Sequence, residues 1–185
     1  MSANTLTPRT RAVLATLVDG GVTHVLGVPD NTSAPIFDAL SRDTAPRLVI
    51  TTREGEAFAL ASGLWLGGAS PLVLVQNTGF LESGDGLRGT AVRMGAPLPF
   101  IVTARGYARM TALGFGPDTP RTPELLRRPD LDSVALMTEP TLRAWGIPYR
   151  TCAADGDPVE AVARLLTDAR ALQHPTALLL LGSLA

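Results

Sequence analysis

Short apolar stretches alternate with segments of helical periodicity along the chain. Each apolar stretch is rich in Val, Ile or Leu and ends at Gly, Pro, Asn or a charged residue, which is typical of buried strands. We predict strands at residues 23–28, 47–52, 71–76, 98–103, 147–152 and 176–181. Between them, apolar side chains recur at helical spacing, as in Val13, Leu14 and Leu17. We predict helices at about residues 8–19, 34–40, 54–68, 81–94, 138–145 and 158–172, and between residues 111 and 129 a surface loop with at most a short helix at 123–128.

This alternation predicts a three-layer α/β/α fold with a six-stranded, mostly parallel sheet covered by helices on both faces. The almost wholly apolar stretch at residues 71–76 is what a parallel strand covered on both faces requires. In such sheets, ligands bind beyond the carboxyl ends of the strands. Four polar segments follow predicted strands and should converge on that edge: residues 29–31, 53–54, 76–79 and 104–106.

Length and composition indicate one ordinary globular unit. The chain has 185 residues, of which 45% are hydrophobic, so we expect a single domain spanning residues 1–185. The net charge is −1 and no basic run exceeds Arg127-Arg128, which argues against binding to nucleic acid or to an acidic membrane. The sequence shows neither a secretory signal nor an apolar span of membrane length, so we expect a cytoplasmic protein.

The residue inventory excludes several kinds of chemistry. A single cysteine, Cys152, rules out an internal disulfide, and two histidines with one thiol argue against a zinc site, so we predict no metal ligands in this chain. All sixteen basic residues are arginine, which excludes a Schiff-base lysine and the lysine of a phosphate-binding P-loop. The Gly-x-Gly-x-x-Gly pattern of dinucleotide-binding folds is absent after the first predicted strand.

Glu54 is the strongest candidate for chemistry. It follows the second predicted strand and opens a run of small and apolar residues, 54–64, apart from Glu56. An acid at this junction is suited to proton transfer, although an acid in the first turn of a helix also stabilises the helix dipole. Glu56 lies two residues further round the helix and should point well away from Glu54. We expect Glu56 at a subunit contact or in solvent.

Four stretches resemble the pyrimidine-binding domain of thiamine diphosphate enzymes: residues 20–30, 52–59, 74–79 and 99–106. Their order and separation look like those of the sulfopyruvate and phosphonopyruvate decarboxylases, and the resemblance covers most of residues 10–182. Ser83-Gly84-Asp85-Gly86 is similar to the start of the family's magnesium and diphosphate motif. That motif ends in an asparagine, and none occurs after Asn77, so we expect residues 83–86 to form a helix surface or a turn.

The resemblance implies roles for residues at the strand ends. The family's glutamate at this junction hydrogen-bonds N1′ of the cofactor's aminopyrimidine and thereby promotes loss of the thiazolium C2 proton; by position this residue is Glu54. Further cofactor contacts would come from Pro29, Asn77, Thr78 and Gly79. Substrate contacts would come from Asp30, Asn31, Gln76 and Arg105. Residues 77–79 could instead cap the next helix, Arg105 could form a surface ion pair, and either Asp30 or Asn31 could face the substrate.

The resemblance also implies a partner, because these sites need a second domain type that holds Mg²⁺ and the diphosphate. We therefore expect an alpha-type subunit of a thiamine diphosphate-dependent decarboxylase acting on a small anionic 2-oxo acid. Its partner would be a diphosphate- and Mg²⁺-binding (PP-type) beta subunit, in a heteromer of two alpha and two beta subunits or larger. The alternatives are a carboligase subunit of acyloin or acetolactate type, a non-catalytic regulatory module, and an unrelated flavodoxin-like domain.

Overall fold

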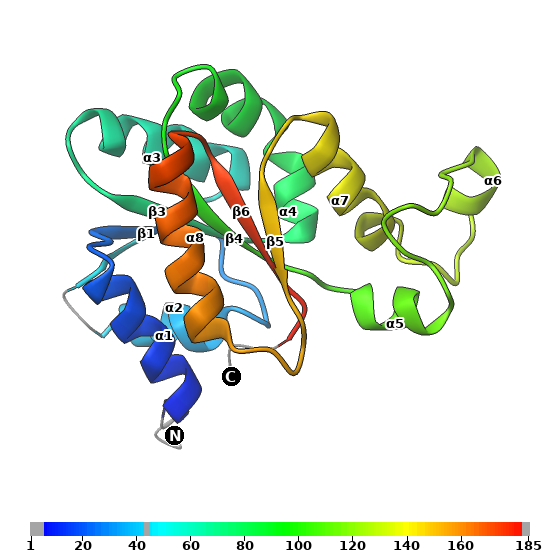
Figure 1. The fold of residues 1–185 in the computed structure, drawn as a ribbon, viewed down its shortest axis with the longest axis horizontal. Coiled ribbons are helices and arrows are strands. Elements are labelled where there is room, and N and C mark those ends of the chain that lie inside the picture. Colours follow the sequence, from blue (N-terminus) through cyan, green and yellow to red (C-terminus); the bar gives the residue numbers. More distant parts are fainter. Residues whose placement is uncertain (1–5, 43–44, 183–185) are drawn as a thin grey trace.

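A parallel sheet forms the centre of the molecule (Figure 1). The structure is a computed structural model that describes residues 6–42 and 45–182, and in these residues six strands pair in the order β2-β1-β3-β4-β6-β5. The strands are β1 (His24–Gly27), β2 (Arg47–Ile50), β3 (Pro71–Gln76), β4 (Pro99–Thr103), β5 (Tyr149–Cys152) and β6 (Thr176–Leu180). All five pairings are parallel. The predicted three-layer α/β/α fold is therefore confirmed.

Helices cover both faces of this sheet (Figure 1). One layer consists of α1 (Pro8–Asp19), α2 (Ala34–Leu40) and α8 (Pro158–Leu172). The other consists of α3 (Glu54–Leu66), α4 (Asn77–Glu82), the π-helix η1 (Asp85–Val92) and α7 (Ser133–Ala144). The two apolar cores follow from the alternation of side chains along each strand. In β3, Leu72 and Leu74 join the first core, and Val73 and Val75 join the second.

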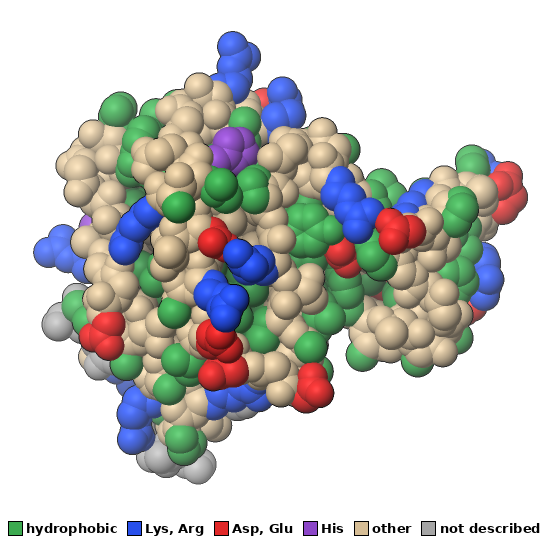
Figure 2. Space-filling view, viewed as in Figure 1, with side chains coloured by type: hydrophobic (Ala, Val, Ile, Leu, Met, Phe, Trp, Pro, Cys, Tyr) green, Lys and Arg blue, Asp and Glu red, His purple; other side chains and the backbone are tan. Residues whose placement is uncertain are grey.

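A small lobe carries α5 (Tyr107–Ala112) and α6 (Pro123–Leu126), and stands off from the body at the right of Figure 1. Figure 2 shows a notch between the lobe and the body. A minor apolar cluster around Met110, Ala135 and Leu136 packs the lobe against the start of α7. It corresponds to the predicted loop region 111–129, extended at both ends.

The helix predicted at 138–145 begins earlier, at Ser133, and this prediction was wrong about its start. The carboxylate of Asp132 caps the helix by accepting the N–H groups of Val134 and Ala135 at 3.1 and 3.2 Å. Pro140 inside the helix has no N–H for the carbonyl of Leu136. Arg121 supplies the missing donor, because its Nε donates to Leu136 O at 3.0 Å. A proline that normally ends a helix is thus accommodated.

The helix predicted at 81–94 also begins earlier than expected. α4 starts at Asn77, directly after the last residue of β3, with no intervening loop, and η1 follows after Gly84. Asp85 and Gly86 lie in η1, so this segment is helical, as predicted for residues 83–86. Because α4 starts directly after β3, Asn77 and Gly79 are buried and Thr78 is exposed.

Candidate active site

The parallel register brings the polar segments after β1, β2, β3 and β4 to one edge of the sheet. Gly27 of β1 lies opposite Ile50 of β2 and Leu74 of β3, and Gln76 of β3 lies opposite Thr103 of β4. Each strand therefore ends at a similar level, and the predicted site residues emerge together beyond it. This is the edge at which open parallel sheets bind ligands.

Glu54 is the first residue of α3 and packs against α4. A Cβ atom at Gly79 would overlap the carboxyl group of Glu54, so the absence of a side chain at position 79 is what admits Glu54. Among the described residues, the half-buried carboxylate of Glu54 has no hydrogen-bond or ion-pair partner. The site thus contains an acid that is held in place by packing while its oxygens stay uncommitted.

Glu82 of α4 binds the start of α3 in return. Its Oε2 accepts a hydrogen bond from the N–H of Gly55 at 3.0 Å. Its Oε1 accepts a hydrogen bond from Nε of Arg53 at 2.9 Å and forms an ion pair with Nη2 of the same arginine. These contacts hold the pKa of Glu82 below its ordinary value, chiefly through the Gly55 N–H and then through Arg53. Glu82 was not among the site residues predicted from the sequence. The indication in the sequence was that Glu82 lies one helical turn after Gly79, which places both residues on the same face of a helix.

Glu56 has a local role on the exposed side of α3. Its Oε2 accepts the backbone N–H and the hydroxyl of Thr52, each at 3.1 Å, so that it reaches back over the start of the helix. Glu56 therefore resembles the acid of a capping box, whose side chain reaches back to the backbone at the start of the helix. Glu56 is exposed, as expected, and points away from the Gly79 contact.

The three residues that follow β3 have different environments. Asn77 is fully buried, and its Nδ2 donates to the carbonyl of Arg105 at 2.8 Å, while its Oδ1 has no partner among the described residues. Thr78 is exposed, and Gly79 is buried against Glu54. Gln76, the last residue of β3, is half-buried. Asn77 therefore ties the end of β3 to the segment after β4.

The turn after β1 separates Asp30 from Asn31. The carboxylate of Asp30 accepts the N–H of Thr32 at 2.7 Å and the hydroxyl of Ser33 at 2.5 Å, and lies 3.4 Å from the hydroxyl of Thr103. Asp30 is thus committed to its own turn and to β4. Asn31 is exposed and lines a hollow that Arg105 also lines, and Pro29 is exposed beside it.

Arg105 is largely exposed at the end of β4. Its Nε lies 3.7 Å from Oδ2 of Asp132, which is longer than a hydrogen bond. The ion pair considered for this residue is therefore present only as a long contact. Within the described residues there is no group of three or more His, Cys, Asp or Glu side chains suited to a metal ion. Nor does any described helix combine the length and apolar character needed to cross a membrane.

Two solved structures with the same fold are decarboxylases. Benzoylformate decarboxylase from Polynucleobacter necessarius superposes with a TM-score of 0.67 at 20% identity, over 93% of this chain and 29% of that one. A thiamine diphosphate-dependent 4-hydroxybenzoylformate decarboxylase from Rhodococcus jostii superposes with a TM-score of 0.60 at 16% identity, over 94% of this chain and 30% of that one. These likenesses establish the fold.

The sequence matches a family as well as a fold. Residues 9–118 match the family model described as "Thiamine pyrophosphate enzyme, N-terminal TPP binding domain", and the chain belongs to this family. Phosphonopyruvate decarboxylase of Streptomyces viridochromogenes is 36% identical over 94 residues, which is 51% of this chain and 24% of the relative. Sulfopyruvate decarboxylase subunit alpha of Methanothermobacter thermautotrophicus is 30% identical over 95 residues, 51% of this chain and 58% of the relative. The resemblance seen in the sequence is thereby confirmed.

Proposed function

We propose that this chain is the alpha-type subunit of a thiamine diphosphate-dependent decarboxylase for a small anionic 2-oxo acid, in which Glu54 activates the cofactor. The observation that carries the proposal is the uncommitted carboxylate of Glu54, half-buried on Gly79 at the ligand-binding edge of a domain of this family. The names of the sequence relatives, phosphonopyruvate and sulfopyruvate decarboxylase, support the reaction type and the substrate class.

The residues present fit the aminopyrimidine end of the cofactor. N1′ of the ring needs a carboxylate with a free oxygen, and Glu54 provides one that no described residue occupies. Gly79 has no side chain, and the carboxyl group of Glu54 occupies the space that one would need. Thr78 and Pro29 are exposed at the same edge and remain available for contact. Thiamine diphosphate, when bound, supplies the carbon that adds to the 2-oxo group and accepts the electron pair released with CO₂.

The chain's own residues would have two tasks. They would hold and transfer one proton, and they would keep the segments at the strand ends in position. Glu54 would share a proton with N1′, and its partly apolar surroundings make that hydrogen bond stronger than it would be in water. Asn77 is buried, so we assign it an indirect role: it positions the Arg105 segment instead of touching the cofactor. Of Asp30 and Asn31, the exposed Asn31 is the better candidate for substrate contact, with Gln76 and Arg105.

A second chain would complete the site. One of the relatives is itself described as a subunit alpha, which supports a separate beta subunit that binds Mg²⁺ and the diphosphate. An active site formed between two chains would also account for the exposure of Thr78 and Asn31, and for the uncommitted carboxylate of the half-buried Glu54, at the strand ends.

Glu54→Gln, mixed with the partner subunit, should reduce turnover by about 10²- to 10⁴-fold and slow exchange of the cofactor's C2 proton. Thiamine diphosphate binding should fall much less, because the amide still fits beside Gly79. The matched control is Glu56→Gln on the same helical turn, which should keep near-normal turnover. Full turnover and normal C2 exchange in Glu54→Gln would contradict the mechanism. Full activity of the partner alone would instead support a regulatory role for this chain.

A further inference from the structure

We infer that a small, mostly apolar pocket between α5, the loop that follows it and α7 binds a neutral aromatic molecule that carries a hydroxyl group. The pocket has a volume of about 190 Å³, and apolar cavities of about 150 Å³ already accommodate a benzene ring. Its apolar wall is formed by Tyr107, Met110, Phe115, Ala135, Leu136 and Leu181. This is a second site, and the inference does not depend on the proposed function.

Glu139 of α7 gives the pocket a charged end. It is half-buried, and no other charged side chain among the described residues lines the pocket. Oε2 of Glu139 accepts a hydrogen bond from the hydroxyl of Tyr149 at 2.8 Å, whereas Oε1 takes part in no hydrogen bond or ion pair within the described part of the chain. A hydrogen bond to a carboxylate is stronger than one to a neutral acceptor, and an apolar setting strengthens it further. The pocket therefore offers an acceptor for one hydroxyl donor.

Arg121 places a positive charge behind the same wall, which favours a neutral ligand over an ion. Its Nε donates to the carbonyl of Leu136 at 3.0 Å and its Nη1 to the carbonyl of Pro117 at 2.7 Å, and both of these residues line the pocket. Because this guanidinium offsets the charge of Glu139, an ammonium ligand gains little from the carboxylate. A carboxylate ligand would be repelled by Glu139 and would lose its hydration at the apolar wall. A hydroxyl group avoids both costs.

Two aromatic side chains favour a ring as the body of the ligand. Tyr107 at the start of α5 and Phe115 after its end both line the pocket, and aromatic rings attract one another in stacked or edge-to-face arrangements. The hydroxyl of Tyr107 is buried near Thr138 and Glu139. Burial raises the pKa of this hydroxyl, and the charge of Glu139 raises it further, so the ring stays neutral. The wall on the α5 side is thus aromatic and uncharged.

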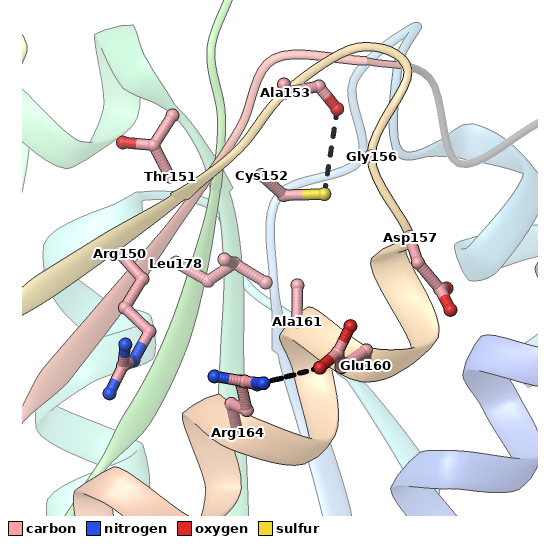
Figure 3. A pocket seen from close by; sticks show the side chains of 10 residues that line it. All are labelled: Arg150, Thr151, Cys152, Ala153, Gly156, Asp157, Glu160, Ala161, Arg164 and Leu178. Carbon is pink, nitrogen blue, oxygen red and sulfur yellow. Dashed lines mark hydrogen bonds and ion pairs between the residues drawn. The ribbon is translucent and has the colours of Figure 1, made fainter.

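The larger hollow beside β5 and α8 shows the contrast (Figure 3). It has a volume of about 490 Å³, and no aromatic side chain of the described residues lines it. Its two arginines are paired with acids of the chain, Arg164 with Glu160, as drawn in Figure 3, and Arg150 with Asp168. An aromatic wall next to an uncommitted carboxylate oxygen therefore distinguishes the pocket at Glu139, whereas size alone does not.

A ligand in this pocket would join the lobe to α7. Tyr107 belongs to α5, which begins two residues after Arg105, and Glu139 belongs to α7. The segment after β4 is in turn held by Asn77, whose Nδ2 donates to the carbonyl of Arg105 at 2.8 Å. A bound ring would therefore restrain α5 and the segment between α5 and the candidate active site. This location suits an effector that acts on the position of the lobe.

A binding experiment on this chain alone tests the pocket. Phenol and benzyl alcohol are the probes, toluene is the control without a donor group, and benzoate is the anionic control. In a titration followed with ¹H–¹⁵N NMR, both probes should shift the signals of residues 107–117 and 135–139, and phenol should bind at least about tenfold more tightly than toluene or benzoate. Bound phenol should also slow amide hydrogen exchange in residues 107–113. Absence of phenol binding, or equal binding of phenol and benzoate, would overturn the inference.

Substitutions at Glu139 and Ala135 separate the polar end of the pocket from its apolar wall. Glu139→Met keeps a side chain of similar length and removes the acceptor, so phenol should bind about tenfold more weakly while toluene binds as before. Ala135→Leu places a larger side chain at the wall and should weaken the binding of every probe at least about tenfold. Glu124→Met, at an exposed acid of the lobe outside the pocket, is the matched control and should bind as the unmodified chain does.

Unchanged phenol binding in Glu139→Met would refute the role of this carboxylate, and unchanged binding in Ala135→Leu would place the phenol elsewhere. None of these measurements needs turnover or the partner subunit. Their outcome is therefore separate from that of the proposed function.

Discussion

Glycine at position 79 is the residue on which the geometry of Glu54 depends. The carboxyl group of Glu54 occupies the space that any side chain at Gly79 would need. The same carboxylate has no partner among the described residues, in contrast to Glu56, which caps its own helix through Thr52. Two acids separated by one residue therefore have different environments, and the difference is set by what each side chain meets.

Gly79→Ala should impair activity without unfolding the protein. The new methyl group must push the carboxyl end of Glu54 aside, which is a flexible group and can move at small cost in stability. Alanine also favours helix by up to about 1 kcal/mol relative to glycine, so the melting temperature should change little. Turnover with the partner should fall at least about tenfold, because the carboxylate leaves its position.

The control for this variant is Gly116→Ala in the lobe, outside the exposed face of α3, where a Cβ atom would also meet nothing within 4 Å. It should keep its activity. Equal activity in the two alanine variants would show that the position of Glu54 does not depend on Gly79.

At the scale of elements, α3 and α4 hold each other through reciprocal contacts of an acid with a glycine. Glu54 of α3 rests on Gly79 of α4, and Glu82 of α4 accepts the N–H of Gly55 in α3. Gly86 of η1 completes the contact, since a Cβ there would overlap the carbonyl of Gly55. The first turn of α3 is therefore fixed by its neighbours, and the direction in which Glu54 points follows from this.

Glu82→Gln should lower stability at neutral pH and remove part of its pH dependence. The folded protein holds the pKa of Glu82 below the ordinary value of 4.5, so the unfolded chain takes up this proton at higher pH than the folded one. The contribution is complete above about pH 5.5 and declines as the pH falls through 4.5 and below. Glutamine keeps an acceptor for Gly55 but loses the charge, so the expected cost at pH 7 is about 1 kcal/mol.

Urea unfolding between about pH 3 and pH 7 measures this difference directly. The lowered pKa values of Asp130 and Asp168 are present in both proteins and cancel in the comparison. Glu160→Gln, which breaks an exposed pair with Arg164, is the control and should cost no more than about 0.5 kcal/mol. A constant difference between the two proteins at every pH would contradict the assigned role of Glu82.

At the scale of the whole molecule, the exposed side of α3 carries uncovered leucines beyond Glu56. Leu60 and Leu66 are 45% and 71% exposed, and helical spacing places them on the same side as Ala59 and Gly63. Ile50, 61% exposed, ends the neighbouring edge strand β2. Because Glu54 begins this helix, a subunit that covers the exposed face of α3 would also lie next to the candidate active site. We expect the proposed beta subunit to bind here.

Leu60→Glu should weaken association with the beta subunit and leave this chain folded, because the side chain is exposed in the structure. Sedimentation of mixed subunits should show a weaker complex, and activity should recover when the beta subunit is added in excess. The matched control is Leu172→Glu on α8, 54% exposed in the opposite helix layer, which should associate normally. Equal complex formation by both variants would place the interface elsewhere.

The hydrophobic pattern predicted the strands, the parallel sheet and the edge on which Glu54, Asn77 and Arg105 meet. These features depend on local periodicity, and on the rule that parallel strands end on one side. The starts of α4 and α7 were not predictable in this way. Asn77 and Ser133 lie in polar segments typical of loops, and they became helical because of Asp132, Arg121 and the packing of α4 on the sheet. The burial of Asn77 followed from that start.

By itself, the sequence determined the fold class, which follows from periodicity and strand order, and the family, which its four strand-end stretches resemble. It also singled out Glu54 as the candidate acid, from its place at a strand-to-helix junction. Only the tertiary structure showed that Gly79 supports Glu54 and that Glu82 anchors its helix. The physical reason is that such contacts join residues from different elements. Their distances depend on how helices pack across the sheet, which no local pattern encodes.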